Sequence, residues 1–417
     1  MSGLLSGVRV IESSMLLNGA ATGMMLADLG AEVIKVESPF LGDYLRLPET
    51  SHLHRQTARN KRSIALDLKV EAGRAAFYRL LATADVFLTN AVGNRNDSLG
   101  IGYAQLAGRK PDLVYCQNTG FGASGPYANL PAHGQMMDAL AGAMPVELDD
   151  AGLTRPRRDH QRRTATLASA GEGTAAGAIY AAYHIAAALV RRSRTGQGCY
   201  IDVSSAEAVL ASAWVAACGA LNAPESNNWW RSETNMKNLA RYQSYVAADG
   251  KFLLFCPEET RFWHIFCDLV GRADLKERQS GEDLRRILQE IFLTRRRDDW
   301  IALAATHRLP IGPVSCGIEE VRADPQISAR SMLSADSRDA FVHVGQPARV
   351  SGCEPAPNSN GPNSPAPELG QHTDVILCEL GFSAAEISAL ANAGVTRAVQ
   401  TARAHMSAEI FAPTANS

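Results

Sequence analysis

Two side chains with the potential for acid–base or nucleophilic chemistry flank position 134 of this 417-residue chain. An imidazole can give or take a proton in a reaction at working pH, which makes His133 a candidate acid or base. Asp138 could act as a nucleophile, but four residues of helix place its carboxylate about 5–6 Å beyond position 134. An ordinary carboxylate on a helix surface or at an interface is the simpler explanation of Asp138. Gly134 itself offers no side chain.

Two glutamates and a glycine-rich loop add to this group. Glu172 and Glu259 are further acids that could take part in proton transfer. Glu259 stands where a helix is expected to begin, and an acid in the first turn of a helix is favoured by the helix dipole alone. Gly120 and Gly122 would let a ligand approach the backbone closely. Tight turns with positive φ require glycine as well, so the loop has a structural explanation too.

Arginines cluster at Arg155–Arg163 and Arg295–Arg297. A solvated surface is the common explanation for such runs, and a clamp for phosphate or carboxylate is the alternative. The eight cysteines include no pair at the close spacing of a zinc or redox motif, so we expect no metal site and a reduced, cytoplasmic protein.

The composition, 46% apolar and 20% charged, is that of a soluble globular enzyme, and the length favours two lobes. A net charge of −2 gives no indication that the chain binds nucleic acid or a membrane surface, which both attract basic proteins. The first residues show no signal-peptide pattern. The apolar stretch 178–190 is too short and too polar to span a bilayer.

The order of predicted elements is that of a doubly wound α/β layer. Apolar β-branched runs predict strands, with small or amphipathic helical segments between them. The predicted strands are 8–12, 32–36, 63–68, 85–90 and 113–118, and the predicted helices are 19–29, 71–82 and 103–107.

Helix is predicted to dominate from 134 to about 192, with a loop near 149–158. A hairpin over 242–255, with Asp249-Gly250 as its turn, opens a smaller lobe. Helices follow at 259–270, 281–292 and 298–306. Segment 354–367, rich in Pro, Asn and Ser, predicts an extended connection. A loop at 369–374 and a helix from Ser383 come next, and the residues after about Met406 are predicted to be unordered.

Six stretches, in order, resemble CoA-transferase family III, the carnitine and bile-acid CoA-transferase group that includes the α-methylacyl-CoA racemases. They are 7–39 (GVRVIE…VESP), 59–69 (RNKRSIALDLK), 99–131 (LGIGYAQL…GASGPYANLP), 194–208 (RTGQGCYIDVSSAEA), 309–333 (LPIGPV…SML) and 369–390 (LGQHTDVIL…AAEISAL). Together they cover nearly the whole chain.

The resemblance implies a large Rossmann-like domain, a smaller α+β domain and long linkers, with two ring-shaped chains interlocked as a dimer. On this basis we expect the first part of the large domain at 1–200, a linker at 201–225, the small domain at 226–325, and a linker with a C-terminal return to the large domain at 326–417.

The resemblance also implies a catalytic aspartate after the glycine loop, which attacks the acyl-CoA thioester and holds the acyl group as a mixed anhydride. That step needs a carboxylate, because a hydroxyl or amide cannot pass the acyl group on in this way. Ungapped alignment of 131–142 puts Gly134 at this position. The chain is therefore expected to lack the acyl-accepting carboxylate.

The racemase branch of the family implies a different use of the same segment. His133 matches a histidine that exchanges the α-proton, and Glu259 matches a glutamate of the racemases. Alignment places the second carboxylate at Gly173 or Thr174, next to Glu172. A buried or interface histidine and a first-turn helix acid are the structural explanations.

CoA would be held largely by backbone and a few basic side chains. The resemblance implies contacts from Lys61, Arg62, Asn90, Asn118, Gly120 and Gly122. The turn Asn90–Asn94 lacks the family's arginine and proline. Arg95 lies three residues past the place expected for that arginine and could reach a phosphate.

The leading interpretation is a catalytically silent subunit of a heteromeric CoA-transferase, paired with a homologous chain that has the aspartate. It resembles the degenerate member of heteromers that activate aromatic succinates, such as benzylsuccinate CoA-transferase. The alternatives are a racemase or epimerase that uses His133 with Glu172 or Glu259, and a non-catalytic CoA-ester binding or scaffold protein. CoA or acyl-CoA is expected as substrate, with no tightly bound cofactor, and the partner is a homologous subunit or a second copy.

Overall fold

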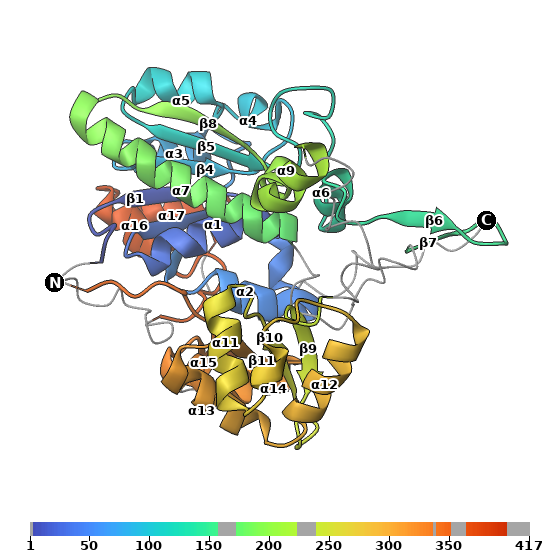
Figure 1. Ribbon diagram of the computed structural model, residues 1–417. Helices are drawn as coiled ribbons and strands as arrows, with labels where there is room; N and C mark the ends of the chain where they lie inside the picture. The colour runs from blue at the N-terminus through green and yellow to red at the C-terminus, as the bar shows by residue number, and fades with distance from the viewer. Residues whose placement is uncertain (1–2, 157–171, 223–238, 337–338, 352–363, 398–417) are drawn as a thin grey trace. The chain divides into compact units, whose positions relative to one another are not determined.

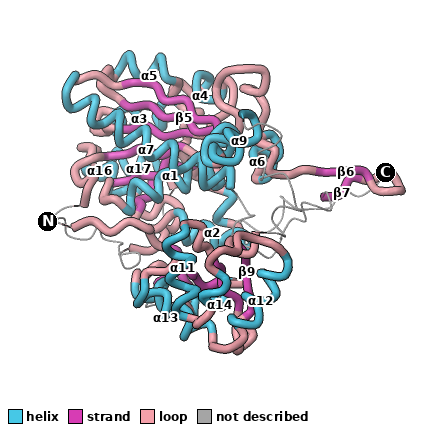
Figure 2. The backbone as a smooth tube through the Cα atoms, viewed as in Figure 1, coloured by secondary structure: helices cyan, strands magenta, loops and turns pink. Residues whose placement is uncertain are grey.

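The computed structural model describes residues 3–156, 172–222, 239–336, 339–351 and 364–397 (Figure 1). Clustering of contacts divides the chain into two compact units, Met1–Ser212 with Pro325–Ser417, and Ala213–Asp324. Figure 2 shows helices and strands in both units. The predicted α/β class is confirmed. The domain limits given above and the interlocked dimer stay predictions.

The first unit is built on a six-stranded parallel sheet. The strand order is β3 (Lys61–Ala65), β2 (Glu32–Glu37), β1 (Arg9–Ser13), β4 (Val86–Thr89), β5 (Val114–Thr119) and β8 (Cys199–Ser204). The chain builds outward from β1 in one direction and then in the other. The order therefore reverses between β1 and β4, which is a topological switch point.

Both faces of this sheet are covered by helices. Successive strand residues point to opposite faces, so Val10 packs on one side and Ile11 on the other. On the first face lie α1 (Leu16–Asp28) and α7 (Glu172–Thr195). On the second lie α3 (Glu71–Leu81), α5 (Tyr103–Arg109), α16 (Thr373–Glu379) and α17 (Ala384–Asn392).

The C-terminal part of the unit ties the edge strand β3 to α16. The backbone N–H of Ala65 donates to Thr373 Oγ1 at 3.1 Å, and Arg62 pairs with Glu379 at 2.7 Å. Shorter elements complete this unit: α2 (Ser51–Thr57), α4 (Arg95–Ser98), α6 (Gln135–Leu140), α8 (Ser205–Ser212), α15 (Pro325–Ala329), β12 (Leu333–Ala335), β13 (Val342–Val344) and the 3₁₀ turns Tyr44–Arg46 and Pro48–Thr50.

One prediction between 134 and 192 is wrong. The segment expected to be a loop near 149–158 contributes to an antiparallel pair, β6 (Val146–Leu148) and β7 (Thr154–Pro156). Asp149 Oδ1 accepts the N–H groups of Ala151 and Leu153 at 2.9 Å each and so closes the turn. Among described residues, helix in this region is limited to α6 and α7.

The second unit has a three-stranded antiparallel sheet, and its predicted hairpin and helices are confirmed. The strand order is β11 (Ile311–Val314), β10 (Phe252–Phe255) and β9 (Gln243–Val246). Its helices are α9 (Trp214–Asn222), α11 (Thr260–Leu269), α12 (Glu282–Phe292), α13 (Arg297–His307) and α14 (Ile318–Ala323), with a 3₁₀ turn at Ala273–Leu275. Its aromatic core includes Phe255, Trp263, Phe266, Phe292 and Trp300.

Helix α7 is longer than the apolar stretch found in the sequence. By length and composition its 24 residues could cross a bilayer, with a mean hydropathy of 1.3 over its most apolar window. Half of that window is buried within the protein, as in the core helix of a soluble protein. Its length therefore carries little weight as an indication of a membrane.

A network of buried charges lies beside the switch point, on β1, β2 and β3. Glu12 accepts from Lys35 Nζ at 2.8 Å and from Lys61 Nζ at 2.6 Å, and Lys35 also pairs with Asp43 at 2.8 Å. All four side chains are at most 2% exposed. Glu37 and Arg46 form a further pair at 2.6 Å. Three acids thus meet three bases.

The charged state of this network follows from its pairing. Burial alone would raise the pKa of the Glu12 carboxyl, but Lys35 and Lys61 outweigh it and hold that pKa below its ordinary value. Burial alone would lower the pKa of Lys35, but Glu12 and Asp43 raise it well above the usual range. Glu12 and Lys35 are therefore ions in the folded protein.

Removing one charge from the network should destabilise the protein strongly. We expect Lys35→Met, which retains most of the aliphatic stem, to lower the free energy of unfolding by about 3–5 kcal/mol, because Asp43 and Glu12 stay buried without their shared cation. The control is Arg286→Met, in an exposed pair with Glu282, with an expected loss of no more than about 0.5 kcal/mol. Chemical denaturation measures both, and equal losses would contradict a special role for the network.

Candidate functional site

The loops after β1 and β4 meet where the strand order reverses. The carboxamide of Asn90 accepts from the Met15 N–H at 3.0 Å and donates to the Met15 carbonyl at 2.5 Å. Ligands of open α/β sheets bind outside the carboxyl ends of the strands at such a point. The candidate site therefore lies at this edge. Asn90, predicted as a CoA contact, uses its carboxamide to hold the loop.

The turn from β1 into α1 is strained, and two side chains of the buried charge network bind its backbone. Leu16 has φ +60°, a left-handed conformation that costs a non-glycine residue on the order of 1 kcal/mol. Its N–H donates to Asp43 Oδ1 at 3.0 Å, and Lys35 donates to the Ser14 carbonyl at 3.0 Å. The buried charge network therefore fixes the backbone of this turn.

Lys61, predicted as a CoA contact, is engaged in contacts within the chain. Its fully buried ammonium group donates to Glu12 and, at 2.8 Å, to the carbonyl of Ala20, so none of its surface is open to a phosphate. Arg62 lies in the first half of β3, away from the carboxyl edge. Its guanidinium pairs with Glu32 and Glu379, each at 2.7 Å. Both residues act as ties within the first unit.

Asn118 is also committed to the protein's own structure. It is fully buried, accepts from Ser205 Oγ at 3.0 Å and donates to Thr22 Oγ1 at 3.3 Å. Asn18, a residue that sequence reasoning missed, donates to the same Ser205 oxygen at 3.0 Å. This network joins α1, β5 and α8 at the carboxyl edge.

The glycine loop after β5 packs against the segment that carries His133. A Cβ on Gly120 would lie 2.2 Å from the Cβ of Ala132, so a larger residue would displace that segment. Gly122 has φ +83°, which favours glycine at the turn. The expected turn with positive φ is present at Gly122, whereas Gly120 is required by close packing, and a contact of this loop with CoA stays a prediction.

Gly134 lies at the amino end of α6 with φ +43°, and nothing approaches within 4 Å of an added Cβ. The space there would admit a side chain, although the backbone favours glycine. His133, just before it, is exposed in the chain. Its imidazole is thus accessible at the position expected for a proton donor or acceptor.

Of the two structural explanations of Asp138, a helix-surface carboxylate does not hold, because the side chain is buried against the start of α7. It is only 3% exposed, and its Oδ1 accepts the N–H of Gly173 at 2.7 Å. A carboxylate at a helix amino terminus satisfies a free backbone N–H and complements the dipole. Asp138 therefore fixes the start of α7 and has no exposed surface for attack on a substrate.

The first turn of α7 contains Gly173 and Thr174, the two positions aligned with the second carboxylate of the racemases. A Cβ on Gly173 would lie 2.6 Å from the Cβ of Met137, so a carboxylate-bearing side chain does not fit there, and Thr174 is buried. Glu172 is exposed at the first residue of the helix. Glu259 is exposed before α11 in the second unit. Its backbone carbonyl accepts the N–H of Phe262 at 3.0 Å, but its carboxylate makes no hydrogen bond to that helix's amino terminus.

Arg95 begins α4, next to the loop that holds Met15. Its guanidinium lies 3.9 Å from Met15 Sδ, and the described residues provide no acidic partner for it. Its side chain is exposed. A cation without a counter-ion beside the switch point suits a phosphate, because arginine binds phosphate oxygens with charge-assisted hydrogen bonds.

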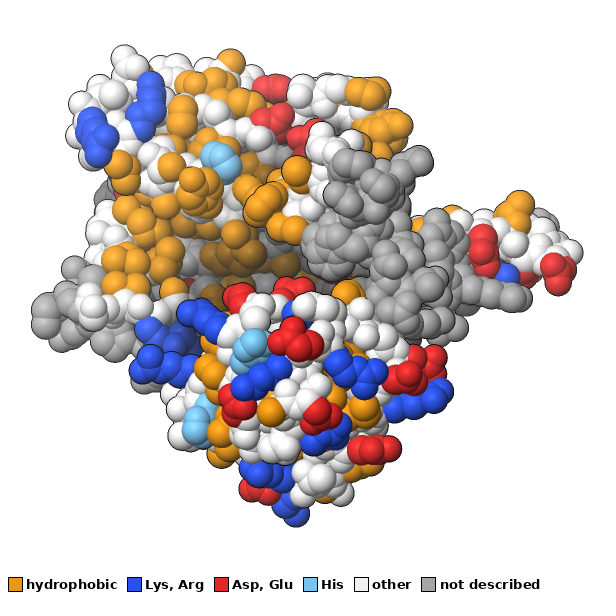
Figure 3. Space-filling model, viewed as in Figure 1, with side chains coloured by type: hydrophobic (Ala, Val, Ile, Leu, Met, Phe, Trp, Pro, Cys, Tyr) orange, Lys and Arg blue, Asp and Glu red, His pale blue; other side chains and the backbone are white. Residues whose placement is uncertain are grey.

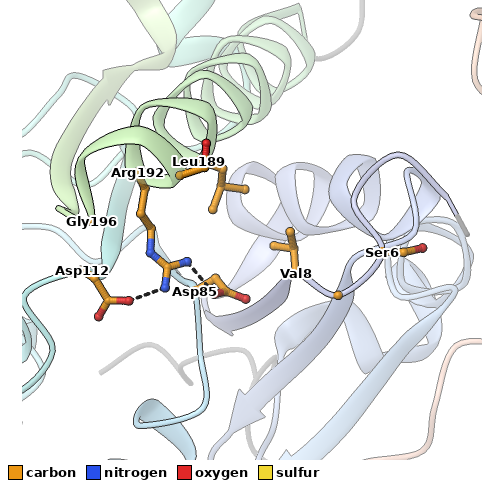
Figure 4. A pocket seen from close by; sticks show the side chains of 9 residues that line it. Ser6, Val8, Asp85, Asp112, Leu189, Arg192 and Gly196 are labelled. Carbon is orange, nitrogen blue, oxygen red and sulfur yellow. Dashed lines mark hydrogen bonds and ion pairs between the residues drawn. The ribbon is translucent and has the colours of Figure 1, made fainter.

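A separate pocket lies at the opposite edge of the sheet, among the segments before β1, β4, β5 and β8 (Figure 4). Arg192 at the end of α7 points between Asp85, at 2.5 Å, and Asp112. Both acceptors neutralise the guanidinium. This pocket is therefore a junction that anchors α7, and it belongs to the amino edge rather than to the candidate site.

Sequence reasoning missed Asp43 and Leu16, which shape the site through a hydrogen bond between residues 27 positions apart. Nothing in their spacing signals these roles. The polar residue Asn18, in an otherwise apolar helical run, was the one available signal.

Two glycines with opposite surroundings test the packing of the site. We expect Gly120→Ala to lower the free energy of unfolding by about 1–3 kcal/mol, because the methyl group overlaps Ala132. Gly108, in α5, has nothing within 4 Å of an added Cβ, so Gly108→Ala should raise stability by up to about 1 kcal/mol through helix propensity. Thermal or chemical unfolding measures both, and a neutral Gly120→Ala would show that the loop yields freely.

Comparison with known proteins connects this site to a family. The model of CoA-transferase family III matches residues 5–373. Succinate–glutarate CoA-transferase of Agrobacterium fabrum is 31% identical over 409 residues, covering 90% of this chain and 95% of that protein. Human α-methylacyl-CoA racemase is 29% identical over 398 residues, covering 92% and 95%.

A solved structure agrees with these matches. The crystal structure of a CAIB/BAIF family protein from Brucella suis superposes with a TM-score of 0.70 at 29% identity, covering 91% of this chain and all of that one. The family match spans both units and includes the β1–α1 turn, the glycine loop and α7. This chain therefore belongs to CoA-transferase family III.

Proposed function

We propose that this chain is a subunit of a CoA-transferase that works with a homologous partner, and that the partner supplies the carboxylate that accepts the acyl group. The overall reaction moves CoA from an acyl-CoA to a free carboxylic acid, as in its relatives. One observation carries the proposal: Gly134, the aligned position of the family's aspartate, has room for a side chain and has none.

The neighbouring carboxylates support this division of labour. Asp138 is buried and bound to the Gly173 N–H, so it cannot replace the missing aspartate. Glu172 is the exposed acid left in the first turn of α7. As an acyl acceptor it would refute the proposal, and any test must therefore examine it directly.

The exposed surface of α7 favours a second chain. Ile179, Tyr183 and Val190 are 55%, 65% and 53% exposed, and Figure 3 shows apolar side chains gathered over the unit that contains this helix. Contiguous apolar surface of this kind marks protein–protein contact. The partner is proposed to be a homologous subunit, with a second copy of this chain as the alternative.

Trapping of the acyl intermediate tests the proposal. The chain, alone and co-purified with its homologous partner, is incubated with acyl-CoA and hydroxylamine, and the carboxylates are examined by mass spectrometry. We expect a hydroxamate on the partner and none on this chain, because position 134 cannot form an anhydride. Glu172→Gln should leave turnover of the complex within about twofold. A hydroxamate on Glu172, abolished in that variant, would refute the proposal.

Racemisation is the second candidate, favoured by the exposed His133 and by the similarity to the human racemase. Racemisation also needs a second acid, and position 173 has no room for a carboxylate side chain. The adjacent Glu172 would have to take that role. We expect the chain to introduce no α-deuterium into an α-methylacyl-CoA in deuterated water, as judged by mass spectrometry. Deuterium uptake that falls at least a hundredfold in His133→Ala would instead assign proton transfer to this chain.

A further inference from the structure

We infer that Asn96 is a positioning residue for acyl-CoA: it fixes the short helix α4 so that the guanidinium of Arg95 faces the phosphates of CoA beside the switch point. The inference rests on the proposed function, because it concerns how this chain holds acyl-CoA. Asn96 is a buried polar side chain with no role in the acyl transfer or proton transfer proposed above.

Asn96 is buried between α4 and the sheet. Only 8% of it is exposed, and its Nδ2 donates to Thr89 Oγ1 at 3.0 Å and to the Tyr115 hydroxyl at 2.9 Å. Thr89 ends β4 and Tyr115 lies in β5, so one carboxamide group joins α4 to two neighbouring strands. A buried polar group of this kind is costly unless it is bonded, so these contacts define one orientation of α4.

The orientation of α4 has to come from such a tie. A helix of four residues is a single turn and has no stability of its own. The backbone carbonyl of Asn96 also accepts the N–H of Ile101 at 2.9 Å, which fixes the exit of the turn. Asn96 therefore anchors α4 through both its side chain and its backbone.

Arg95 projects from the exposed side of the same turn. Its guanidinium reaches Met15, whose backbone is held in turn by Asn90. The loop before Arg95 is packed as well, because a Cβ on Gly93 would lie 3.1 Å from Asn129 Oδ1. A cation presented in one place by a fixed turn loses less entropy on binding phosphate than a free side chain does.

Calorimetric titration with CoA and with pantetheine, which has no phosphate, tests the inference on the chain as purified, alone or with its partner. Arg95→Ala and Asn96→Ala should each weaken CoA binding by about tenfold and leave pantetheine binding unchanged. The double variant should bind CoA no more weakly than Arg95→Ala, because both changes remove one interaction. A purely structural role for Asn96 would instead add to the loss from Arg95→Ala.

Matched variants separate positioning from general damage. Tyr78→Phe removes a hydrogen bond of 2.9 Å to the Gly100 carbonyl, just beyond α4, and should bind CoA normally. Should Asn96→Ala fail to fold, Thr89→Val and Tyr115→Phe each remove one bond of the tie and should weaken CoA binding by about threefold. Unchanged CoA binding in Asn96→Ala, or in both Thr89→Val and Tyr115→Phe, would overturn the inference. A wild-type chain that does not bind CoA would overturn the proposed CoA site as well.

Discussion

The buried charge network centred on Glu12 is the constraint on which the carboxyl edge of the sheet depends. Well-packed apolar residues could stabilise this part of the core equally well, since buried ion pairs lose much of their attraction to desolvation. Apolar residues could not, however, accept the N–H of Leu16 or donate to the carbonyl of Ser14. The charges therefore specify the backbone geometry of one turn, and that turn lies at the switch point where the candidate site is placed.

The same principle recurs around the site: polar side chains hold backbone groups in place and leave few side chains free for a ligand. Asn90 holds Met15, and Asp138 holds the amino end of α7. Side chains expected to contact CoA, such as Lys61 and Asn118, turn out to support the scaffold. Arg95, His133 and Glu172 are exposed at or near this edge.

The sequence was sufficient to predict the layered α/β fold because apolar β-branched runs and the helical segments between them are local signals. The pair β6–β7 was missed because its strands are only three residues long, although Asp149 offered a turn signal. The site was less predictable, because its key contacts join residues far apart in the chain. Asn90 and Met15 are 75 residues apart, and Lys61 and Glu12 are 49 apart, so spacing alone could not show that these side chains were already engaged.

The glycines of the carboxyl edge separate scaffold from chemistry. Gly120 and Gly173 are each required by a neighbouring side chain, since a Cβ would overlap Ala132 or Met137. Gly134 is crowded by nothing, and only its positive φ favours glycine. Packing therefore explains the glycines at positions 120 and 173, but it does not explain the glycine at position 134. This contrast supports the proposal that a homologous partner supplies the acyl acceptor, because a glycine that packing does not require stands at the position expected for that carboxylate.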